Sequence, residues 1–268
     1  MTTSVNIIAS HQPFLAKRGF DYMETLAKQL DYFSPDSELS HLNAIKGSVA
    51  VSPLLYRALL LSRIMQTKTG NMFRVDFEGI SRDPQGEHRF RVGPFPWVHL
   101  GKDTLINLGG IAKGYIVDRT FAFLRQQGAQ NILVDAGGDI RVQSMERPWK
   151  IGLYNPLNAQ SPYGVIKLMS GALVTSGLSE RSRGIGELRR TPFFNPQTAT
   201  FYKETPFVSV SVQGQFASVS EVYAKCLLMG HRPLLGKHHK AVGVRADYKV
   251  IVFDSKGYPS EQAARLKE

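Results

Sequence analysis

The apolar positions between residues 105 and 141 follow first one period and then another. Residues 105–108 form a short apolar run that predicts a strand, and from Ile111 to Leu124 the apolar residues recur at helical spacing. Residues 132–134 form a second apolar run, of the kind expected for a buried strand. Glycines separate these segments, with a pair before the helix, one glycine after it and another pair after the second strand. The pattern predicts a strand–helix–strand unit.

The first glycine pair, Gly109 and Gly110, lies between the predicted strand and the helix. Glycine has no Cβ, so the backbone there can approach a ligand closely. The first turn of a helix favours an anion such as phosphate. Lys113 places a positive charge in that turn, where a cation alone disfavours the helix. These features indicate an anionic partner, but ordinary packing glycines explain the spacing equally well, and neither the dinucleotide fingerprint nor the P-loop pattern is present.

The rest of the chain alternates between helical and extended patterns. Helices are predicted over residues 19–33, from Ser52-Pro53 to about residue 66, and over residues 218–229. Ser37 is predicted to cap a further short helix. Strands are predicted over residues 5–9, 149–154, a hairpin of 165–169 with 172–175, a half-buried strand at 207–212, and a closing hairpin of 240–244 with 249–254.

With 268 residues, the chain is long enough for one large domain or two small ones. Its 43% hydrophobic and 21% charged residues are ordinary for a globular protein, and no apolar run is long enough for a transmembrane helix. The first residues lack the features of a secretory signal, so we expect a cytoplasmic protein, or a periplasmic one if a leader has been removed. The single cysteine, Cys226, is predicted to be a core residue.

The formal net charge of +11 permits nucleic acid, a membrane surface or an anionic small molecule as the partner. The basic residues are scattered, with one group in a loop at residues 181–190 and another in the KHHK run at residues 237–240. No basic stripe with interleaved aromatic residues and no known nucleic-acid motif is present. Only the net charge supports a nucleic-acid partner, so we predict none.

Several motifs, in one order along the chain, resemble the ApbE family of flavin transferases, the FAD:protein FMN transferases. The central part contributes INLGGIAKGYIVD at residues 106–118 and ILVDAGGDIRV at residues 132–142, followed by PWKIGLYNP at residues 148–156. Further segments that match the family pattern are FSPDSELSHLN, TGNMFR, VTSGLSER, FFNPQTA and FASVSEVYAKCLLMG. Together these motifs cover nearly the whole chain and are far more specific than a single glycine motif.

The resemblance implies both a fold and a chemistry. It implies an α+β fold, a mixed α/β arrangement with a central strand–helix–strand unit and mostly antiparallel sheets, formed by residues 1–268 as a single domain of two intimately packed subdomains. Members of the family bind FAD and, with a divalent cation that is usually Mg²⁺, split its pyrophosphate. The FMN half passes to a threonine of an acceptor flavoprotein, and AMP leaves.

The resemblance also assigns site residues, position by position. Asn195 replaces an aspartate of the family and, with Lys113, is assigned to catalysis. The metal is assigned to the Gly110 carbonyl, to Ser220, which replaces a metal-binding aspartate, and to Glu221, the nearest carboxylate. The residues assigned to flavin nucleotide binding are Asn43, Phe73, Arg74, Asn107, Gly109, Gly110, Lys113, Gly137, Gly138, Asp139, Ser176 and Gly177.

The departures from the family pattern share one direction, because acidic residues are lost while small and apolar framework residues remain. Arg74, Asn107, Asn195 and Ser220 all stand at positions that are acidic in the family. Mg²⁺ prefers carboxylate oxygens, so we expect weak metal binding and a weakened or lost metal-dependent transfer, with Arg74 supplying positive charge near the phosphates. Two interpretations stay open: a working FAD:protein FMN transferase with an unusual site, and a non-catalytic homologue that binds FAD or acts as a binding or scaffold partner.

Overall fold

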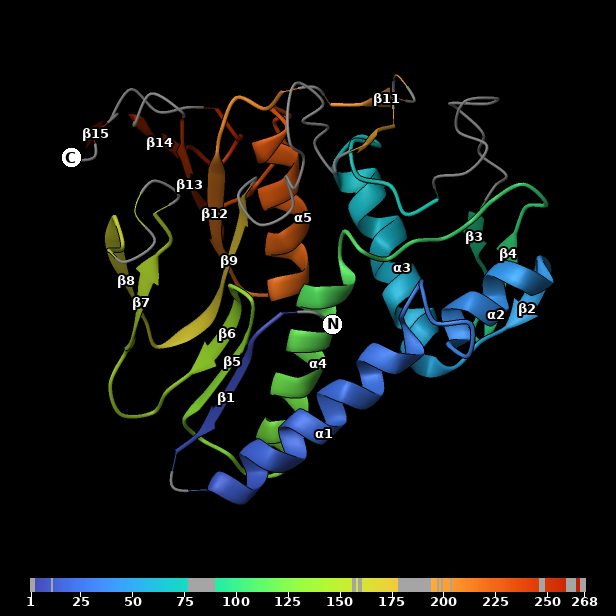
Figure 1. Cartoon of the computed structure of the whole chain (residues 1–268), viewed down its shortest axis with the longest axis horizontal. Coiled ribbons are helices and arrows are strands. Elements are labelled where there is room, and N and C mark those ends of the chain that lie inside the picture. The colour runs from blue at the N-terminus through green and yellow to red at the C-terminus, as the bar shows by residue number, and fades with distance from the viewer. Residues whose placement is uncertain are drawn as a thin grey trace.

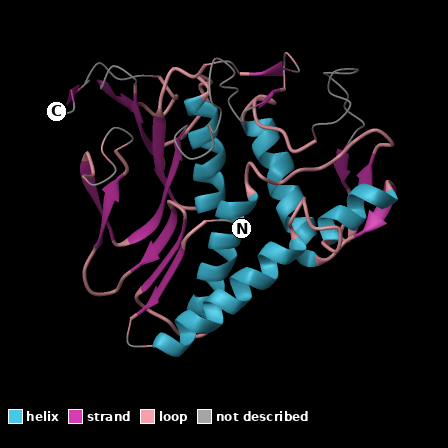
Figure 2. Cartoon of the chain, viewed as in Figure 1, coloured by secondary structure: helices cyan, strands magenta, loops and turns pink. Residues whose placement is uncertain are grey.

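The computed structural model describes residues 3–10, 12–76, 90–155, 158, 161–177, 194–196, 198, 200–202, 204–245, 249–258 and 264–265. Helices occupy the middle of the molecule, with a large sheet on one side and a small sheet on the other (Figure 1, Figure 2). Every strand pairing among the described residues is antiparallel. This architecture confirms the predicted α+β fold with mostly antiparallel sheets; the division of a single domain into two subdomains stays a prediction.

The eight-stranded sheet is built from segments spread over the whole chain. Its strands lie in the order β1 (Val5–Ala9), β5 (Ile132–Ala136), β6 (Asp139–Gln143), β9 (Ser170–Gly177), β12 (Ser209–Gly214), β13 (Lys240–Val244), β14 (Lys249–Phe253) and β15 (Ala264–Arg265). The pairing of β13 with β14 confirms the predicted closing hairpin. The first strand therefore lies at one edge of the sheet and the last strand at the other.

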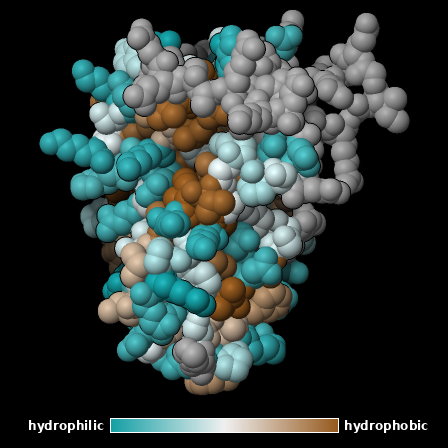
Figure 3. All heavy atoms as spheres, turned by 90° about the vertical axis from the view of Figure 1, so that its left-hand side faces the viewer, coloured by the Kyte–Doolittle hydropathy of each residue, from teal (hydrophilic) through white to brown (hydrophobic). Residues whose placement is uncertain are grey.

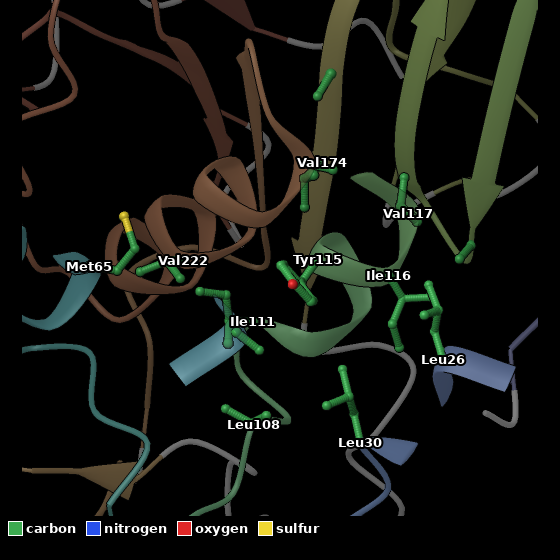
Figure 4. Packing of buried hydrophobic residues seen from close by; sticks show 14 of the residues in the cluster. Leu26, Leu30, Met65, Leu108, Ile111, Tyr115, Ile116, Val117, Val174 and Val222 are labelled. Atoms are coloured by element: carbon green, nitrogen blue, oxygen red, sulfur yellow. The ribbon is translucent and has the colours of Figure 1, made fainter. Parts of the chain in front are cut away.

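Two helices cover one face of the large sheet (Figure 1). Helix α4 (Ala112–Gln126) contacts β5 and β6, whereas helix α5 (Ala217–Leu228) contacts β9 and β12. Helix α1 (Pro13–Gln29) packs against α4. Figure 4 shows side chains from all three helices, among them Leu26, Tyr115 and Val222, gathered in the main hydrophobic core. Burial of this core fixes α4 and α5 side by side on the sheet.

Smaller elements flank this body on both sides. The small sheet has the order β2 (Gly47–Ala50), β4 (Trp97–Leu100) and β3 (Phe90–Val92). It lies beside the helices α2 (Glu38–Ile45) and α3 (Pro53–Lys68) (Figure 1). The strands β10 (Phe194–Asn195) and β11 (Thr200–Phe201) form a separate pair, as do β7 (Trp149–Leu153) and β8 (Gly164–Leu168).

The β7–β8 pair contributes to a second, small core with Val142 and Leu173 of the large sheet. Figure 3 views the molecule from the left-hand side of Figure 1, where apolar surface lies between hydrophilic side chains. Among the exposed apolar residues, Val165 of β8 is 58% exposed. The pair therefore has one face in a core and part of its surface in solvent.

The helix ends follow the signals in the sequence. The Ser52 hydroxyl accepts a hydrogen bond from the Leu55 N–H, and the Ser37 hydroxyl accepts one from the Ser40 N–H, so both serines are N-caps as predicted. Gly128 follows α4 with a φ of +89°, a left-handed conformation that ends many helices. Helix α1 differs from its prediction, because it begins at Pro13 and ends at Gln29. Among the described residues, no helix combines the length and the apolar composition needed to cross a membrane.

Strand pairing differs from the predictions at two places. The strand predicted at residues 105–108 is wrong, since Ile106 forms only an isolated bridge with Asp76. The predicted hairpin of residues 165–169 with 172–175 is also wrong, because β8 pairs with β7 while β9 lies between β6 and β12. Both errors arise because pairing partners are set by tertiary packing and not by the local pattern.

Strand β12 shows that alternation of polarity need not mean alternation of exposure. Ser209 and Ser211 are as buried as their apolar neighbours, so the prediction of a half-buried strand is wrong. The Ser211 hydroxyl lies 2.8 Å from the hydroxyl of Thr175 on the neighbouring strand. This hydrogen bond offsets the cost of burying the Ser211 hydroxyl, whereas the Ser209 hydroxyl has no hydrogen-bond partner among the described residues.

Candidate functional site

A cleft of about 710 Å³ lies where several distant segments of the chain meet. It is bounded by the glycine turn before α4, the turn between β5 and β6, the end of β9, one side of α5 and residues 72–75. Most of the residues assigned from the sequence line it, namely Phe73, Arg74, Asn107, Gly109, Gly110, Lys113, Gly137, Asp139, Ser176, Gly177 and Glu221.

Asn43 and Asn195 were assigned to the site but do not line the cleft. The buried Asn43 side chain donates to the Ile106 carbonyl at 2.9 Å and accepts from the Ile106 N–H at 2.8 Å. It therefore holds the backbone just before the glycine turn. The Asn195 side chain accepts a hydrogen bond from the Thr198 N–H at 3.4 Å, whereas both chain neighbours of Asn195 line the cleft.

Gly138 and Ser220 also lie outside the cleft lining. Gly138 has a φ of +85°, and its N–H donates to the Asp135 carboxylate at 2.9 Å, which closes the turn between β5 and β6. Ser220 is fully buried, and a Cβ added to Gly214 of β12 would lie 2.6 Å from its hydroxyl oxygen. The Ser220 hydroxyl thus packs against the sheet, and Glu221, one residue later, reaches the cleft.

The glycine turn brings backbone and an aromatic ring together at the cleft. The Asn107 side chain accepts the Gly109 N–H at 2.8 Å, a local bond typical of an Asx turn. A Cβ on Gly110 would lie only 2.8 Å from the ring of Phe73. Glycine at this position therefore allows the ring to rest against the turn.

Helices α4 and α5 cap each other at their N-terminal turns. The Glu221 carboxylate of α5 accepts the Gly114 N–H of α4 at 2.8 Å. In return, the Asp118 carboxylate of α4 accepts the N–H groups of Ala217 at 2.9 Å and of Ser218 at 3.0 Å. A Cβ on Gly114 would lie 2.7 Å from the Ala217 carbonyl, so only glycine permits this close approach. These contacts fix Glu221 at the edge of the cleft.

Lys225 is a site residue that the sequence analysis did not identify. It lies one turn after Glu221 on α5 and forms an ion pair with that carboxylate. Its ammonium group also donates to the Gly110 carbonyl at 3.2 Å. The signal for this pair was the spacing of four residues between an acid and a base on one helix. An ammonium group therefore contacts the carbonyl that the family resemblance assigns to the metal.

Lys113 contacts the buried carboxyl group of Asp139 in the cleft. The Lys113 ammonium lies 3.2 Å from Asp139 Oδ1 and donates to the Gly137 carbonyl at 3.2 Å. Asp139 is 1% exposed, and its Oδ2 has no hydrogen-bond partner among the described residues. Burial, together with the charge of Glu221, raises the pKa of Asp139 to about 8, although the charges of Lys113 and Lys225 oppose the shift. Asp139 therefore tends to hold a proton at neutral pH.

Arg74 lines the cleft, but a neighbouring carboxylate neutralises its charge. Its Nε and Nη2 donate to the two carboxylate oxygens of Asp76 at 3.1 and 2.5 Å. Both side chains are nearly buried, at 7% and 2% exposure. The expectation that Arg74 supplies positive charge near the phosphates is thereby weakened, because the pair is neutral as a whole.

The remaining wall of the cleft is mainly apolar. Phe194 and Phe201 of the β10–β11 pair stack edge to face with their ring centres 5.5 Å apart. Cys226 is buried, as predicted, and burial raises the pKa of its thiol to about 12, so the thiol is neutral. An apolar wall with a few charged groups is typical of a site for a small molecule or cofactor. The apolar side chains of the lining belong to Phe33, Met72, Phe73, Val75, Phe194, Pro196, Phe201, Cys226 and Met229.

The Mg²⁺ expected from the resemblance does not fit this arrangement. Mg²⁺ requires near-octahedral oxygen ligands at about 2.0–2.1 Å. Both carboxylate oxygens of Glu221 already bind other groups, and the Gly110 carbonyl binds Lys225. Within the part of the chain that the structure describes, no group of three or more His, Cys, Asp or Glu side chains is placed to hold a metal ion. An ammonium group and a divalent cation would also repel each other at this position.

Comparison with known proteins places these features in a family. The model of the ApbE family matches residues 74–234. The FAD:protein FMN transferase of Rhodobacter capsulatus is 30% identical over 165 residues, which are 60% of this chain and 31% of that protein. The FAD:protein FMN transferase of Klebsiella pneumoniae (strain 342) is 40% identical over 77 residues, which are 28% of this chain and 23% of that protein. The matched part of the chain thus spans less than a third of the length of these curated relatives.

Solved structures are similar along nearly the whole chain. The ApbE protein from Thermotoga maritima superposes with a TM-score of 0.79 at 20% identity, over 97% of this chain and 94% of that one. The flavin transferase ApbE from Vibrio cholerae superposes with a TM-score of 0.74 at 20% identity, with the same coverage of 97% and 94%. At this level of identity the similarity shows a common fold. The family model covers more than half of the sequence, and the chain therefore belongs to the ApbE family.

Proposed function

We propose that this protein binds FAD in the cleft and transfers the FMN half to a threonine of an acceptor flavoprotein, with release of AMP. The observation that carries this proposal is the position of Lys113 and Lys225 beside the glycine turn, in a cleft whose remaining wall is apolar. FAD requires both surfaces, because its pyrophosphate is anionic and its ring system is aromatic. Family membership and the names of the relatives support the same substrate.

The proposed transfer balances without an oxidant or a reductant. The threonine oxygen forms a bond to the phosphorus of the FMN half, and the bond between that phosphorus and the bridging oxygen breaks. AMP leaves with the bridging oxygen, and the hydroxyl proton passes to water. In such a reaction the protein contributes mainly positioning and electrostatic stabilisation. Here the ammonium groups of Lys113 and Lys225 would hold the phosphate oxygens, and the glycine turn would let the phosphates approach the backbone.

We expect this transfer to be slow, because the acidic residues of the family pattern are replaced. A second candidate function is therefore a non-catalytic homologue that binds FAD and serves as a binding or scaffold partner. The contact of Lys225 with the Gly110 carbonyl favours it, since a group assigned to the metal is engaged within the protein. The two candidates share FAD binding and differ in the release of AMP.

Two measurements on the purified chain separate these candidates. The first is a titration with FAD in which binding is monitored by flavin fluorescence. The second measures AMP release from FAD by chromatography, in the presence of an acceptor flavoprotein and with or without Mg²⁺. An acceptor in which valine replaces the target threonine is the matched control. Binding with AMP release supports the transferase, and binding without AMP release supports the non-catalytic homologue. No FAD binding up to about 1 mM contradicts both.

A further inference from the structure

We propose that Lys113 and Lys225 form a fixed pair of ammonium groups that binds the pyrophosphate directly, so that nucleotide binding in this cleft needs no divalent cation. The inference rests on the proposed function, because it takes the pyrophosphate of FAD as the ligand. It goes beyond that function by stating which groups of the cleft bind the ligand and that this binding requires no divalent cation.

The hydrogen bonds of Lys225 leave one donor available. A lysine ammonium group carries three N–H donors and no acceptor. One donor of Lys225 is used by the Glu221 carboxylate and another by the Gly110 carbonyl. Among the described residues, Lys225 has no third hydrogen-bond partner, and its side chain lines the cleft. The third N–H is therefore available to a ligand.

Lys113 repeats this arrangement on the neighbouring helix. Its ammonium group contacts the Asp139 carboxyl group and the Gly137 carbonyl, each at 3.2 Å. Within the described part of the chain it too keeps one N–H without a partner. Two available donors on two ammonium groups match the two phosphate groups of a pyrophosphate. Charge-assisted hydrogen bonds of this kind are shorter and stronger than neutral ones.

Buried partners hold both lysines in place before a ligand arrives. The side chains of Lys113 and Lys225 are 26% and 19% exposed, whereas those of Asp139 and Glu221 are each 1% exposed. Because each lysine is already fixed, little side-chain freedom is lost when the ligand binds. A divalent cation at the Gly110 carbonyl would have to displace the Lys225 ammonium group, which already contacts both this carbonyl and Glu221.

An independent observation also indicates a missing ligand at this point. The Oδ2 atom of Asp139 is buried and has no hydrogen-bond partner within the described residues, although Asp139 lines the cleft. A buried polar atom without a partner costs free energy unless water or a ligand satisfies it. This atom belongs to the carboxyl group that contacts Lys113, so it lies beside the proposed pair of ammonium groups. A phosphate oxygen only accepts hydrogen bonds, so it can pair with this carboxyl group through the O–H of the protonated form.

The test compares the affinity for FAD and for ADP in buffer with EDTA and in buffer with Mg²⁺. ADP carries a pyrophosphate but no flavin. It therefore tests pyrophosphate binding by the two ammonium groups separately from the proposed FAD function. For the unmodified protein we expect dissociation constants that differ less than about twofold between the buffers. In EDTA, Lys225→Met should weaken both ligands by about tenfold or more, because one charge-assisted hydrogen bond is lost. Lys225→Arg, which keeps the charge, should weaken them less.

Two further variants make the result interpretable. Lys28→Met is the matched control, because Lys28 pairs with Glu24 at the same spacing on α1 but is 75% exposed, and it should leave both affinities unchanged. The double variant Glu221→Gln with Lys225→Met keeps an acceptor for the Gly114 N–H and avoids an unpaired buried charge, so it tests binding if the single variant fails to fold.

The outcomes distinguish the inference from the proposed function. One outcome is that ADP binds in EDTA and needs Lys225, whereas FAD does not bind. This result supports pyrophosphate binding by the pair of ammonium groups and contradicts the FAD function. The inference is overturned if Mg²⁺ strengthens either ligand by tenfold or more in the unmodified protein, or if Lys225→Met binds both as tightly as Lys28→Met. Failure of both ligands to bind in either buffer overturns the inference and the function together.

Discussion

The Glu221 carboxylate accepts a hydrogen bond of 2.8 Å from the Gly114 N–H across a separation of 107 residues. This bond joins the two helices that carry the lysines of the cleft. Lys113 immediately precedes Gly114 on α4, and Lys225 lies one turn after Glu221 on α5. Because the two helices cap each other, the distance between the two ammonium groups depends on how closely the helices pack. The geometry of the cleft and the stability of the helix pair are therefore linked.

Asp118→Ala should lower the free energy of unfolding by about 3 kcal/mol. The change removes the acceptor for the first N–H groups of α5 and leaves the guanidinium of Arg141, now 2.5 Å from Asp118, without its carboxylate. Urea denaturation measures the effect. The control is Asp21→Ala, which removes an exposed pair with Lys17 and should therefore destabilise the protein far less than Asp118→Ala does. Equal losses in the two variants would contradict the capping role of Asp118.

Gly114→Ala should destabilise the protein by more than about 2 kcal/mol, because the added methyl group would overlap rigid backbone of Ala217 at 2.7 Å. The matched control is Gly19→Ala on α1, where the nearest atom is the flexible Leu124 side chain at 3.0 Å. Alanine also has the higher helix propensity, which offsets part of the cost at both sites. Thermal unfolding of both variants measures the difference. A Gly114→Ala protein as stable as Gly19→Ala would show that the helices do not approach so closely.

The local elements of the fold were predictable because their signals are local. The Ser52 and Ser37 caps and the glycine after α4 each depend on residues within one or two turns. Strand partners were not predictable in the same way. Ile106 belongs to an apolar run that reads as a strand, yet its backbone is held by the side chain of Asn43, far away in the sequence. No periodicity within the run reports such a contact.

The candidate site was predictable in its segments and less so in its contacts. Motif positions identified Lys113, Asp139 and Glu221 as residues of the site, and all three line one cleft. Lys225 was missed, because its role depends on the angle at which α5 faces the Gly110 carbonyl. A shift of one residue on a helix turns a side chain by about 100°. The sequence alone could not decide between Ser220 and Glu221 as the residue that faces the cleft.

Asp139 should make the stability of the protein depend on pH. Burial raises the pKa of this carboxyl group to about 8, so the folded chain holds a proton that the unfolded chain has already lost above about pH 4. The folded state therefore binds more protons, and the contribution of this group to stability is lost as the pH rises through about 8. The Asp139→Asn variant has no carboxyl group to titrate at this position. The stability of this variant, measured relative to the unmodified protein, should therefore increase with pH.

Urea unfolding at about pH 5 and about pH 8 measures this dependence, since it follows from the difference in bound protons. Asp21→Asn is the control, because it makes the same chemical change at an exposed ion pair. An Asp139→Asn protein whose stability changes with pH in parallel with the unmodified protein would show that Asp139 is ionised in the folded state over this range.

Phe201→Ala should weaken FAD binding several-fold and leave ADP binding unchanged. Phe201 lines the cleft and is 53% exposed, so its removal should disturb the fold little. An aromatic contact with the flavin ring is worth about 1 kcal/mol beyond the area it buries, and ADP has no such ring. Phe95→Ala is the control, because Phe95 is 56% exposed and does not line the cleft. Equal losses for FAD and ADP would place the flavin elsewhere.

The most direct test of the central claim is a crystal structure of this protein with FAD, grown once in EDTA and once in Mg²⁺. We predict that in both crystals the pyrophosphate lies in the cleft, with its oxygens within hydrogen-bond distance of the ammonium groups of Lys113 and Lys225. We also predict that Lys225 keeps its contact with the Gly110 carbonyl. FAD bound outside the cleft would contradict the account. So would a metal ion between the Gly110 carbonyl and the pyrophosphate with Lys225 displaced.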